Sequence, residues 1–244
     1  MFFTEFGKYL LLIRSVFKKP EKWKIYWKEI ILNMDSVGVG SLGLVAIIST
    51  FIGAVMTMQI AFQLVSDLIP SSIIGQINRD SSILELSPTI TALVLAGKVG
   101  SSISSQIGSM RVSEQIDALE IMGINAPGYL ILPKILASIT MVPLLVVVSI
   151  FLAISGGLIG GALSGAVTPA DYIMGITSDF NGYTVSVSLV KAFVFGFIIT
   201  SVSAFQGFYV RGGSLEVGQA STKSVVVSCI TILIFDYIIT ALML

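Results

Sequence analysis

The chain has 244 residues, of which 55% are apolar and only 11% are charged. A typical soluble domain carries about 25% charged residues, and the mean hydropathy of +0.95 exceeds what a single soluble core could hide. The composition therefore predicts an integral membrane protein. The absence of histidine excludes a Ser-His-Asp triad, and the single cysteine, Cys229, excludes an internal disulfide and a cysteine metal site.

The N-terminal segment, residues 1–34, is the most basic part of the chain. Residues 1–28 hold seven basic and two acidic side chains, a net charge of +5 that the other 216 residues offset. Because cytoplasmic flanks of membrane spans are enriched in Lys and Arg, the N-terminus is expected to be cytoplasmic. Apolar residues at helical spacing predict an interfacial amphipathic helix on the inner leaflet, and a first helix packed into the bundle is the alternative. These residues are Phe2, Phe6, Leu10, Ile13 and Phe17.

The rest of the chain, residues 35–244, is predicted to be one domain of five membrane spans. A span needs about 20 mostly apolar residues, and five stretches meet this requirement. The fold class is therefore an all-α integral membrane protein, with a cytoplasmic N-terminus and a C-terminus on the outer side. The outer loops, residues 66–82 and 164–184, hold one basic residue, Arg79. The spans cover about 37–65, 83–107, 135–163, 185–210 and 224–244.

The third span is rich in small residues at GxxxG spacing. Gly156 is paired with Gly160 in this pattern, and Gly157 with Gly161. Small residues allow helix backbones to approach closely in lipid, so these glycines predict helix packing, and a subunit contact is the alternative. The chain shows no internal repeat, which counts against an inverted-repeat secondary transporter.

The segment between spans two and three predicts a short cytoplasmic helix. Ser113 is its expected N-cap, Gly123 its end, and Pro127 a barrier to its resumption. Apolar Val112, Ile116, Leu119 and Met122 are expected on one face, with carboxylates on another. The helix either covers the bundle or is a coupling helix that sits in a groove of a separate ATPase. The candidate coupling residues are Arg111, Glu114, Asp117 and Glu120.

Residues 84–124 resemble the central signature of the MlaE family of ABC transporter permeases. They read LELSPTITALVLAGKVGSSISSQIGSMRVSEQIDALEIMGI, against a family pattern of approximately ELGP…LLxAGRxGSAxxAEIGxMRxTEQIDALExMG. Further matches lie in residues 207–226 and 235–243, so the resemblance covers about 37–244. Lys98 stands where the family often has Arg, and Ser87 replaces a Gly. Leu84 replaces a basic residue sometimes found before Glu85, so Glu85 lacks that local partner.

The resemblance implies a permease subunit that moves phospholipids between the inner and outer membranes. It implies a homodimer in the bacterial inner membrane, or in the plastid inner envelope. A separate ATPase subunit, which binds ATP and Mg, and a periplasmic MCE-domain protein are the implied partners. The chain itself has no P-loop motif, so no cofactor and no catalytic residue are expected in it.

Four charges lie within the predicted spans: Glu85, Lys98, Lys191 and Asp236. An ionisable group in a span is costly and is therefore a functional candidate. Glu85 is expected to line an outward-facing lipid cavity near a headgroup, with an interfacial carboxylate facing water as the alternative. Lys98 is expected to be structural, either reaching the inner surface or satisfying carbonyls beside Gly97 and Gly100.

Two further sets of residues within the predicted spans are candidates for a structural or a substrate-binding role. Lys191 and Asp236 are expected to pair across helices if their role is structural. Met56, Gln59 and Gln63 at the outer end of span one are candidate substrate contacts, with Met suited to varied acyl chains. Ordinary bundle packing is the alternative for Met56.

The composition of the chain is also compatible with two other classes of membrane protein, a transporter or channel without an ATPase and an intramembrane enzyme. A secondary transporter or channel for another hydrophobic substrate is the alternative to the ABC permease, and it would need no coupling helix and no ATPase. An intramembrane enzyme is disfavoured because the chain has neither a G-x-S-x-G nor a GxGD motif.

Overall fold

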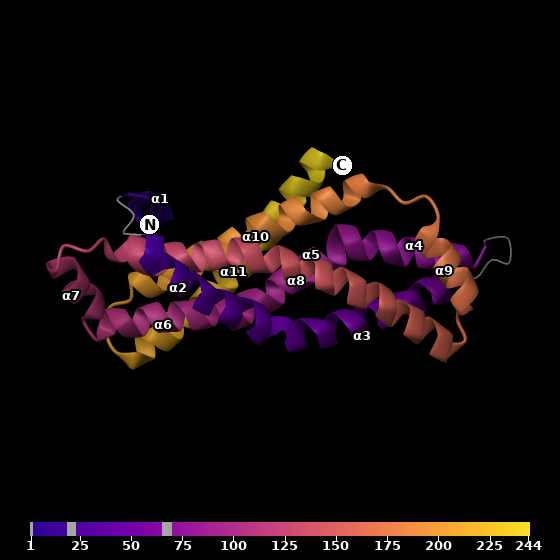
Figure 1. The fold of residues 1–244 in the computed structure, drawn as a ribbon, viewed down its shortest axis with the longest axis horizontal. Helices are drawn as coiled ribbons and strands as arrows, with labels where there is room; N and C mark the ends of the chain where they lie inside the picture. The colour runs from indigo at the N-terminus through magenta and orange to yellow at the C-terminus, as the bar shows by residue number, and fades with distance from the viewer. Residues whose placement is uncertain (1, 19–22, 65–69) are drawn as a thin grey trace. The chain divides into compact units, whose positions relative to one another are not determined.

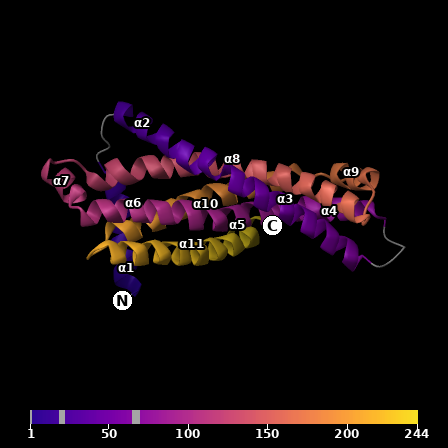
Figure 2. The same cartoon turned by 90° about the horizontal axis from the view of Figure 1, so that it is seen from below.

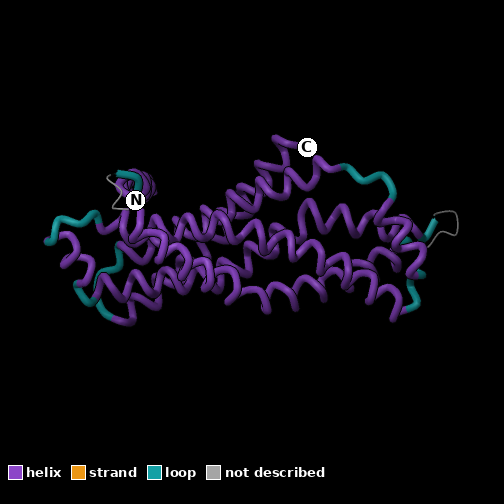
Figure 3. The backbone as a smooth tube through the Cα atoms, in the orientation of Figure 1, coloured by secondary structure: helices purple, strands orange, loops and turns teal. Residues whose placement is uncertain are grey.

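The computed structural model describes residues 2–18, 23–64 and 70–244 (Figure 1). Residues 1, 19–22 and 65–69, which fall in the predicted N-terminal segment, at the end of the first span and in the first outer loop, lie outside the described residues. All regular structure in the described part is helical (Figure 3). The helices are α1 (Phe2–Val16), α2 (Trp23–Met34), α3 (Gly40–Gln63), α4 (Ser72–Ser81), α5 (Ser87–Leu95), α6 (Ser101–Val112), α7 (Gln115–Ile121), α8 (Ala126–Ser164), α9 (Pro169–Thr177), α10 (Gly182–Phe208) and α11 (Ser214–Met243).

Three π-helical segments join some of these helices end to end. They are η1 (Asp35–Val39), η2 (Ser82–Leu86) and η3 (Ala96–Gly100). A π-helical turn inside an α-helix is rare and is frequently found at functional sites. Here η2 contains Glu85 and η3 contains Lys98, so both charges of the second span lie in such a turn.

The predicted five spans are confirmed as five helical stretches long and apolar enough to cross a membrane. The structure extends most of them beyond the predicted bounds, because a helix continues past the apolar residues that a membrane requires. Helix α8, for example, begins at Ala126 rather than near residue 135. Pro127 therefore lies in the first turn of a helix, where its missing N–H costs nothing, and it does not stop the chain from resuming a helix. The stretches are Tyr26–Gln63, Ser72–Val112, Ala126–Ser164, Gly182–Phe208 and Ser214–Met243.

The chain forms two compact units, and several long helices contribute residues to both. Unit 1 comprises Met1–Gly40, Ala92–Val142 and Phe193–Phe235. Unit 2 comprises Ser41–Thr91, Pro143–Ala192 and Asp236–Leu244. Each unit is built from segments distant in sequence, so each depends on tertiary packing rather than on one continuous stretch.

Unit 2 contains two short helices where the sequence predicted outer loops. Helices α4 and α9 pack against each other (Figure 2). Thr168 caps α9 by accepting a hydrogen bond from the Asp171 backbone N–H, and Pro169 occupies the first helical position. This start signal is visible in the sequence, but the segment is too short to register as a span. Both predicted outer loops are thus partly helical.

A buried arginine joins α4 to the end of α9. Arg79 is 2% exposed, and its guanidinium donates to the carbonyl oxygens of Ile176 at 2.7 Å and Ser178 at 2.5 Å. Its Nε also lies 2.8 Å from Asp80 Oδ1. The carbonyls at a helix C-terminus lack intrahelical donors, so this cation satisfies groups that would otherwise be unpaired.

A buried polar network supports the same region. Asn78 Nδ2 donates to Thr57 Oγ1 at 3.0 Å and to the Tyr172 hydroxyl at 2.5 Å. The Tyr172 hydroxyl donates to the Ile154 carbonyl at 3.1 Å. Burial raises the pKa of Tyr172, an effect that the hydrogen bond from Asn78 partly offsets. Since its members are mutually satisfied, the network stabilises a single arrangement of α3, α4, α8 and α9 within unit 2.

The glycines of the third span pack against α3 of the same chain. A Cβ added at Gly156 would overlap the carbonyl of Thr50, and one added at Gly160 would meet the Cα and Cβ of Ala54. Gly53 faces the Ala153 backbone in the same way. The GxxxG pattern therefore serves close packing of α3 on α8 within unit 2, as predicted for helix packing.

Replacing Gly156 with alanine is expected to destabilise the fold by about 2 kcal/mol, because the new methyl group must displace backbone atoms. The unfolding midpoint in detergent measures this change. Gly43→Ala is the matched control, since its added Cβ has no heavy atom within 4 Å and alanine is the better helix former. Equal midpoints for the two variants would contradict the packing argument.

Helix α1 has one buried and one exposed apolar face. Leu12 and Val16 are buried at 3% and 0% exposure. Of the residues predicted to face lipid, Phe6 and Leu10 are exposed at 52% each, and Phe17, just beyond the end of α1, at 59%. Ile13 is half-buried, and the side chain of Phe2 lies outside the described residues. The helix thus packs on unit 1 along one side and leaves the predicted interfacial face uncovered.

Candidate functional site

The intramembrane charges of unit 2 converge on Lys191. Its side chain, on α10, is 0% exposed, and its Nζ lies 2.8 Å from Glu85 Oε1 and 2.9 Å from Asp236 Oδ1. Glu85 is 43% exposed and Asp236 is 15% exposed. Asp236 Oδ1 has no directed hydrogen bond among the described residues, so its contact with Lys191 is a charge interaction. We name Glu85, Lys191, Asp236 and Thr240 the charge cluster.

Lys191 also satisfies a backbone carbonyl that the local sequence leaves open. Its Nζ donates to the Leu84 carbonyl at 3.0 Å. In a regular α-helix that carbonyl would accept from the residue four positions later, which is Pro88 and has no N–H. The π-helical turn η2 and Pro88 together explain why an ammonium from α10 is accommodated at this point of the second span.

Thr240 is the member of the charge cluster that sequence reasoning missed. Its hydroxyl lies 3.1 Å from Glu85 Oε1 and 2.8 Å from the Asp236 carbonyl oxygen, so one proton serves two acceptors. Asp236 and Thr240 are four residues apart and share one face of α11. That spacing was the available signal, but hydroxyls are too common in membrane helices for it to stand out.

Lys98 lies apart from the charge cluster, in unit 1. Its side chain is exposed, and its Nζ donates to the carbonyl of Gly40 at the start of α3. The lysine therefore satisfies a carbonyl, as expected for a structural role, but the carbonyl belongs to a distant segment rather than to the turn around Gly97 and Gly100. No carboxylate in the described part of the chain pairs with it.

The three candidates at the outer end of span one have different environments. Met56 packs against the apolar core of unit 2 formed by Ile60, Ile74, Val167 and Tyr172. Gln59 and Gln63 are exposed on α3. Neither glutamine forms a hydrogen bond with a charge-cluster residue among the described residues, so the structure does not bring these candidates to Glu85.

The short helix predicted between spans two and three is present as α7, but it begins differently. Glu114, at φ 59°, precedes α7 in the left-handed region, and Ser113 follows the end of α6. The Ser113 hydroxyl donates to the Ser109 carbonyl at 2.8 Å, so the prediction that Ser113 caps α7 is wrong. The left-handed residue turns the chain between α6 and α7, which also separates Val112 from the α7 face.

Of the four apolar residues predicted on one face of α7, only Ile116 is fully buried. Val112 is 37% exposed and Met122 is 66% exposed, while the neighbouring Ile121 is 87% exposed. Gly123, at φ 78°, ends α7 as predicted, and the Ile124 N–H donates back to the Leu119 carbonyl. The end of α7 thus presents two uncovered apolar side chains.

Arg111 and Asp117 position α7 against α6. Arg111 Nη1 lies 2.5 Å from Asp117 Oδ1, and the guanidinium lies 5.9 Å from the ring centre of Phe208 on α10. Both partners are part-exposed, so solvent screens the ion pair and it contributes little to overall stability. Glu114 and Glu120 are exposed and form no ion pair among the described residues. The four candidate coupling residues therefore divide into a positioning pair and two free carboxylates.

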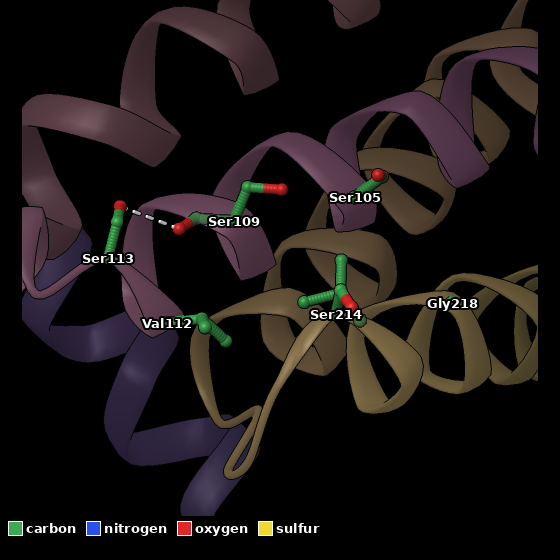
Figure 4. Close-up of a pocket in the computed structure, with 7 residues that line it drawn as sticks. Ser105, Ser109, Val112, Ser113, Ser214 and Gly218 are labelled. Atoms are coloured by element: carbon green, nitrogen blue, oxygen red, sulfur yellow. Dashed lines mark hydrogen bonds between the residues drawn. The ribbon is translucent and has the colours of Figure 1, made fainter.

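A groove of about 590 Å³ lies in unit 1 beside the turn that joins α6 to α7 (Figure 4). The end of α6 and the start of α11 form its walls, and four of its seven lining residues are serines. The lining residues are Ser105, Ser109, Val112, Ser113, Ser214, Val217 and Gly218. No group of acidic or cysteine side chains able to hold a metal occurs in the part of the chain that was described.

Comparison with known proteins places the chain in a transporter family. Residues 30–242 match the family model described as Permease MlaE. A probable ABC transporter permease protein of Rickettsia bellii is 36% identical over 233 residues, which cover 96% of this chain and 88% of the relative. A probable ABC transporter permease protein of Synechocystis is 32% identical, covering 95% and 88%. The chloroplastic protein TRIGALACTOSYLDIACYLGLYCEROL 1 of Arabidopsis thaliana is 32% identical, covering 90% and 63%.

The family model spans all five membrane-spanning stretches almost completely, and it includes the charge cluster and α7. The relatives named as permeases are matched over most of their own length as well. The chain therefore belongs to the MlaE permease family and is a multi-pass membrane permease of the ABC transporter type.

Proposed function

We propose that this chain is the membrane subunit of an ABC transporter that moves phospholipids between the inner and outer membranes. It works as a homodimer in the bacterial inner membrane, with the N-terminus cytoplasmic and the C-terminus periplasmic. A separate ATPase supplies the energy, and a periplasmic MCE-domain protein receives or delivers the lipid. The proposal goes beyond the permease family by naming the substrate, the partners and the orientation.

The observation that supports the substrate proposal is the half-exposed carboxylate of Glu85, which lies beside the fully buried ammonium of Lys191. Lys191 and Thr240 hold Glu85 Oε1 from within the protein, and 43% of the Glu85 side chain stays accessible. An accessible carboxylate in a membrane span suits a polar headgroup, because an acyl chain alone needs no charged partner. The name of the Arabidopsis relative, which is that of a glycolipid, agrees with a lipid substrate.

The proposed ATPase contact is α7. Glu114 at its start and Glu120 near its end are exposed carboxylates, and its C-terminal end carries the uncovered side chains of Ile121 and Met122. An apolar anchor with a charged rim is the usual composition of a protein interface. We propose that α7 transmits closure of the ATPase dimer to α6 and α8, between which it lies in the chain (Figure 1).

Glu85→Gln tests the lipid role. The amide keeps the shape and accepts from Thr240 but removes the charge, so we expect about a tenfold loss of lipid crosslinking, the value of one charge-assisted contact. Outer-membrane integrity is expected to fail in cells that carry the variant. Gln219→Glu is the control, since that exposed residue lies outside the charge cluster and outside the candidate substrate contacts. Unchanged lipid crosslinking and an intact outer membrane for Glu85→Gln would contradict the proposed lipid role of Glu85.

Co-purification of an ATPase subunit distinguishes the proposed ABC transporter from a secondary transporter or channel. The chain extracted in mild detergent is expected to carry an ATPase subunit in a 1:1 ratio, which the proposed homodimer with two ATPase copies requires. Transport by the reconstituted chain without an ATPase would refute the proposal.

A further inference from the structure

Helix α1 presents three distinct faces. At about 100° per residue, Tyr9, Leu12 and Val16 fall together, and the exposed Phe6 and Leu10 lie about a quarter turn away. The basic side chains Lys8 and Arg14 lie on the remaining arc, where Lys8 Nζ is 3.1 Å from Glu5 Oε1. Phe17 and Lys18 follow directly after Val16 at the end of α1. A helix with an exposed apolar face and basic flanks suits an anionic membrane surface.

The buried face fixes α1 to α10. The hydroxyl of Tyr9 lies 2.8 Å from Ser201 Oγ, and its ring makes an edge contact with Phe205 at 5.7 Å between ring centres. Burial raises the pKa of Tyr9, so the phenol stays neutral and its hydrogen bond with Ser201 is kept. Together with the burial of Leu12 and Val16, these contacts make α1 part of unit 1 rather than a free tail.

Asn125 joins the end of α1 to the segment after α7. Its Nδ2 donates to the carbonyl of Ser15 at 2.9 Å and to the carbonyl of Lys18 at 2.5 Å. Ser15 lies in the last turn of α1 and Lys18 just beyond its end, and the Ser15 carbonyl also accepts the Lys18 N–H. Gly128 permits the approach, because a Cβ there would lie 2.7 Å from Asn125 Nδ2 and 3.2 Å from the Val16 carbonyl.

Asn125 is also placed directly between α7 and α8. Gly123 and Ile124 close the end of α7, and the Asn125 carbonyl accepts the N–H of Tyr129 in the first turn of α8. One residue therefore bonds through its side chain to the membrane-surface helix and through its backbone to the helix that follows α7. The side chain of Asn125 therefore links the end of α1 directly to this junction.

We propose that α1 senses an anionic lipid surface and that Asn125 is the positioning residue that relays its position to α7, making the partner ATPase sensitive to the lipids around the permease. The inference rests on the proposed function, because it requires α7 to contact the ATPase. The ligand is the anionic lipid surface itself, bound by the apolar face and basic flank of α1.

The test compares ATP hydrolysis by the complete complex in two kinds of nanodisc. One kind contains phosphatidylcholine only, and the other contains phosphatidylcholine with phosphatidylglycerol. We expect the anionic lipid to change the wild-type rate by about fivefold, the low end of usual coupling between sites. Asn125→Asp removes the donor and sets a carboxylate against two carbonyls, so its rate is expected to be the same in both nanodiscs.

Three comparisons make the result decisive. Asn181→Asp is the matched control, since its Oδ1 only accepts from the Tyr183 N–H and the new carboxylate keeps that bond; it should respond like the wild type. Leu10→Gln combined with Phe17→Gln should also abolish the lipid response, by weakening the exposed apolar face. A wild-type complex that hydrolyses ATP equally in both nanodiscs overturns the sensing proposal but leaves the proposed function intact.

Two results for Asn125→Asp would also overturn the relay. One is a retained lipid response, which would show that the side chain transmits nothing. The other is loss of ATPase association in both nanodiscs, which would assign Asn125 to assembly alone. Failure of the wild-type chain to bind any ATPase would instead count against the proposed function.

Discussion

Replacing Lys191 with methionine is expected to destabilise the protein by about 3 kcal/mol, the usual cost of removing one partner of a buried ion pair. Methionine keeps most of the side-chain volume, so the loss is electrostatic. Glu85 and Asp236 would be left facing each other without a cation, and the Leu84 carbonyl would lose its donor. The unfolding midpoint in detergent measures the effect.

A neutral variant of the whole charge cluster separates stability from transport. Combining Lys191→Met with Glu85→Gln and Asp236→Asn removes the unpaired charges, and replacing a buried ion pair as a unit is often close to neutral. We expect the triple variant to recover most of the lost stability and still to fail in lipid transport. A Lys191→Met variant as stable as the wild type would contradict the paired geometry, and transport by the triple variant would remove the cluster from the mechanism.

Charge reversal on α7 is expected to weaken association with the ATPase by at least about tenfold, or 1.4 kcal/mol. The variant carries Glu114→Lys and Asp117→Lys, which replace two acidic groups at the proposed interface. Asp117→Lys also places a cation beside Arg111, whose Nη1 lies 2.5 Å from the native carboxylate. Co-purification of the ATPase with the tagged permease measures the loss.

Two controls distinguish interface charge from damage to α7. The swap Arg111→Asp with Asp117→Arg restores an ion pair at the same place, so the permease should fold normally. Glu114→Gly removes one carboxylate at a left-handed position that glycine adopts without strain. If the charge-reversed variant binds the ATPase as well as these controls do, α7 is not the coupling helix.

The comparison of α6 and α7 shows why local sequence signals need tertiary context. Ser113 is a good N-cap residue, and acidic residues follow it, so the pattern favoured a helix that starts there. The chain instead uses the Ser113 hydroxyl to bond the last turn of α6 and turns at Glu114. A serine side chain can bond the backbone at either helix end, and the local sequence alone does not distinguish the two.

Properties that depend on neighbours along the chain can be predicted from the amino-acid sequence. Hydropathy over windows of about 20 residues predicts five spans, and the local signature of residues 84–124 predicts the family. The end of α7 at Gly123 also follows from local chemistry, since glycine adopts a positive φ without penalty. Each of these properties is encoded within one continuous stretch of the chain.

Which polar groups contact one another follows only from the tertiary packing of the helices. Thr240 and Glu85 are 155 residues apart, Lys191 and the Leu84 carbonyl 107, and Asn125 and the Ser15 carbonyl 110. Sequence spacing reports which residues share a helix face, but helices in a membrane pack through rotation and close approach that no single helix encodes. In the apolar interior an unpaired polar group is costly, so the packing that pairs all of these groups is the one the chain adopts.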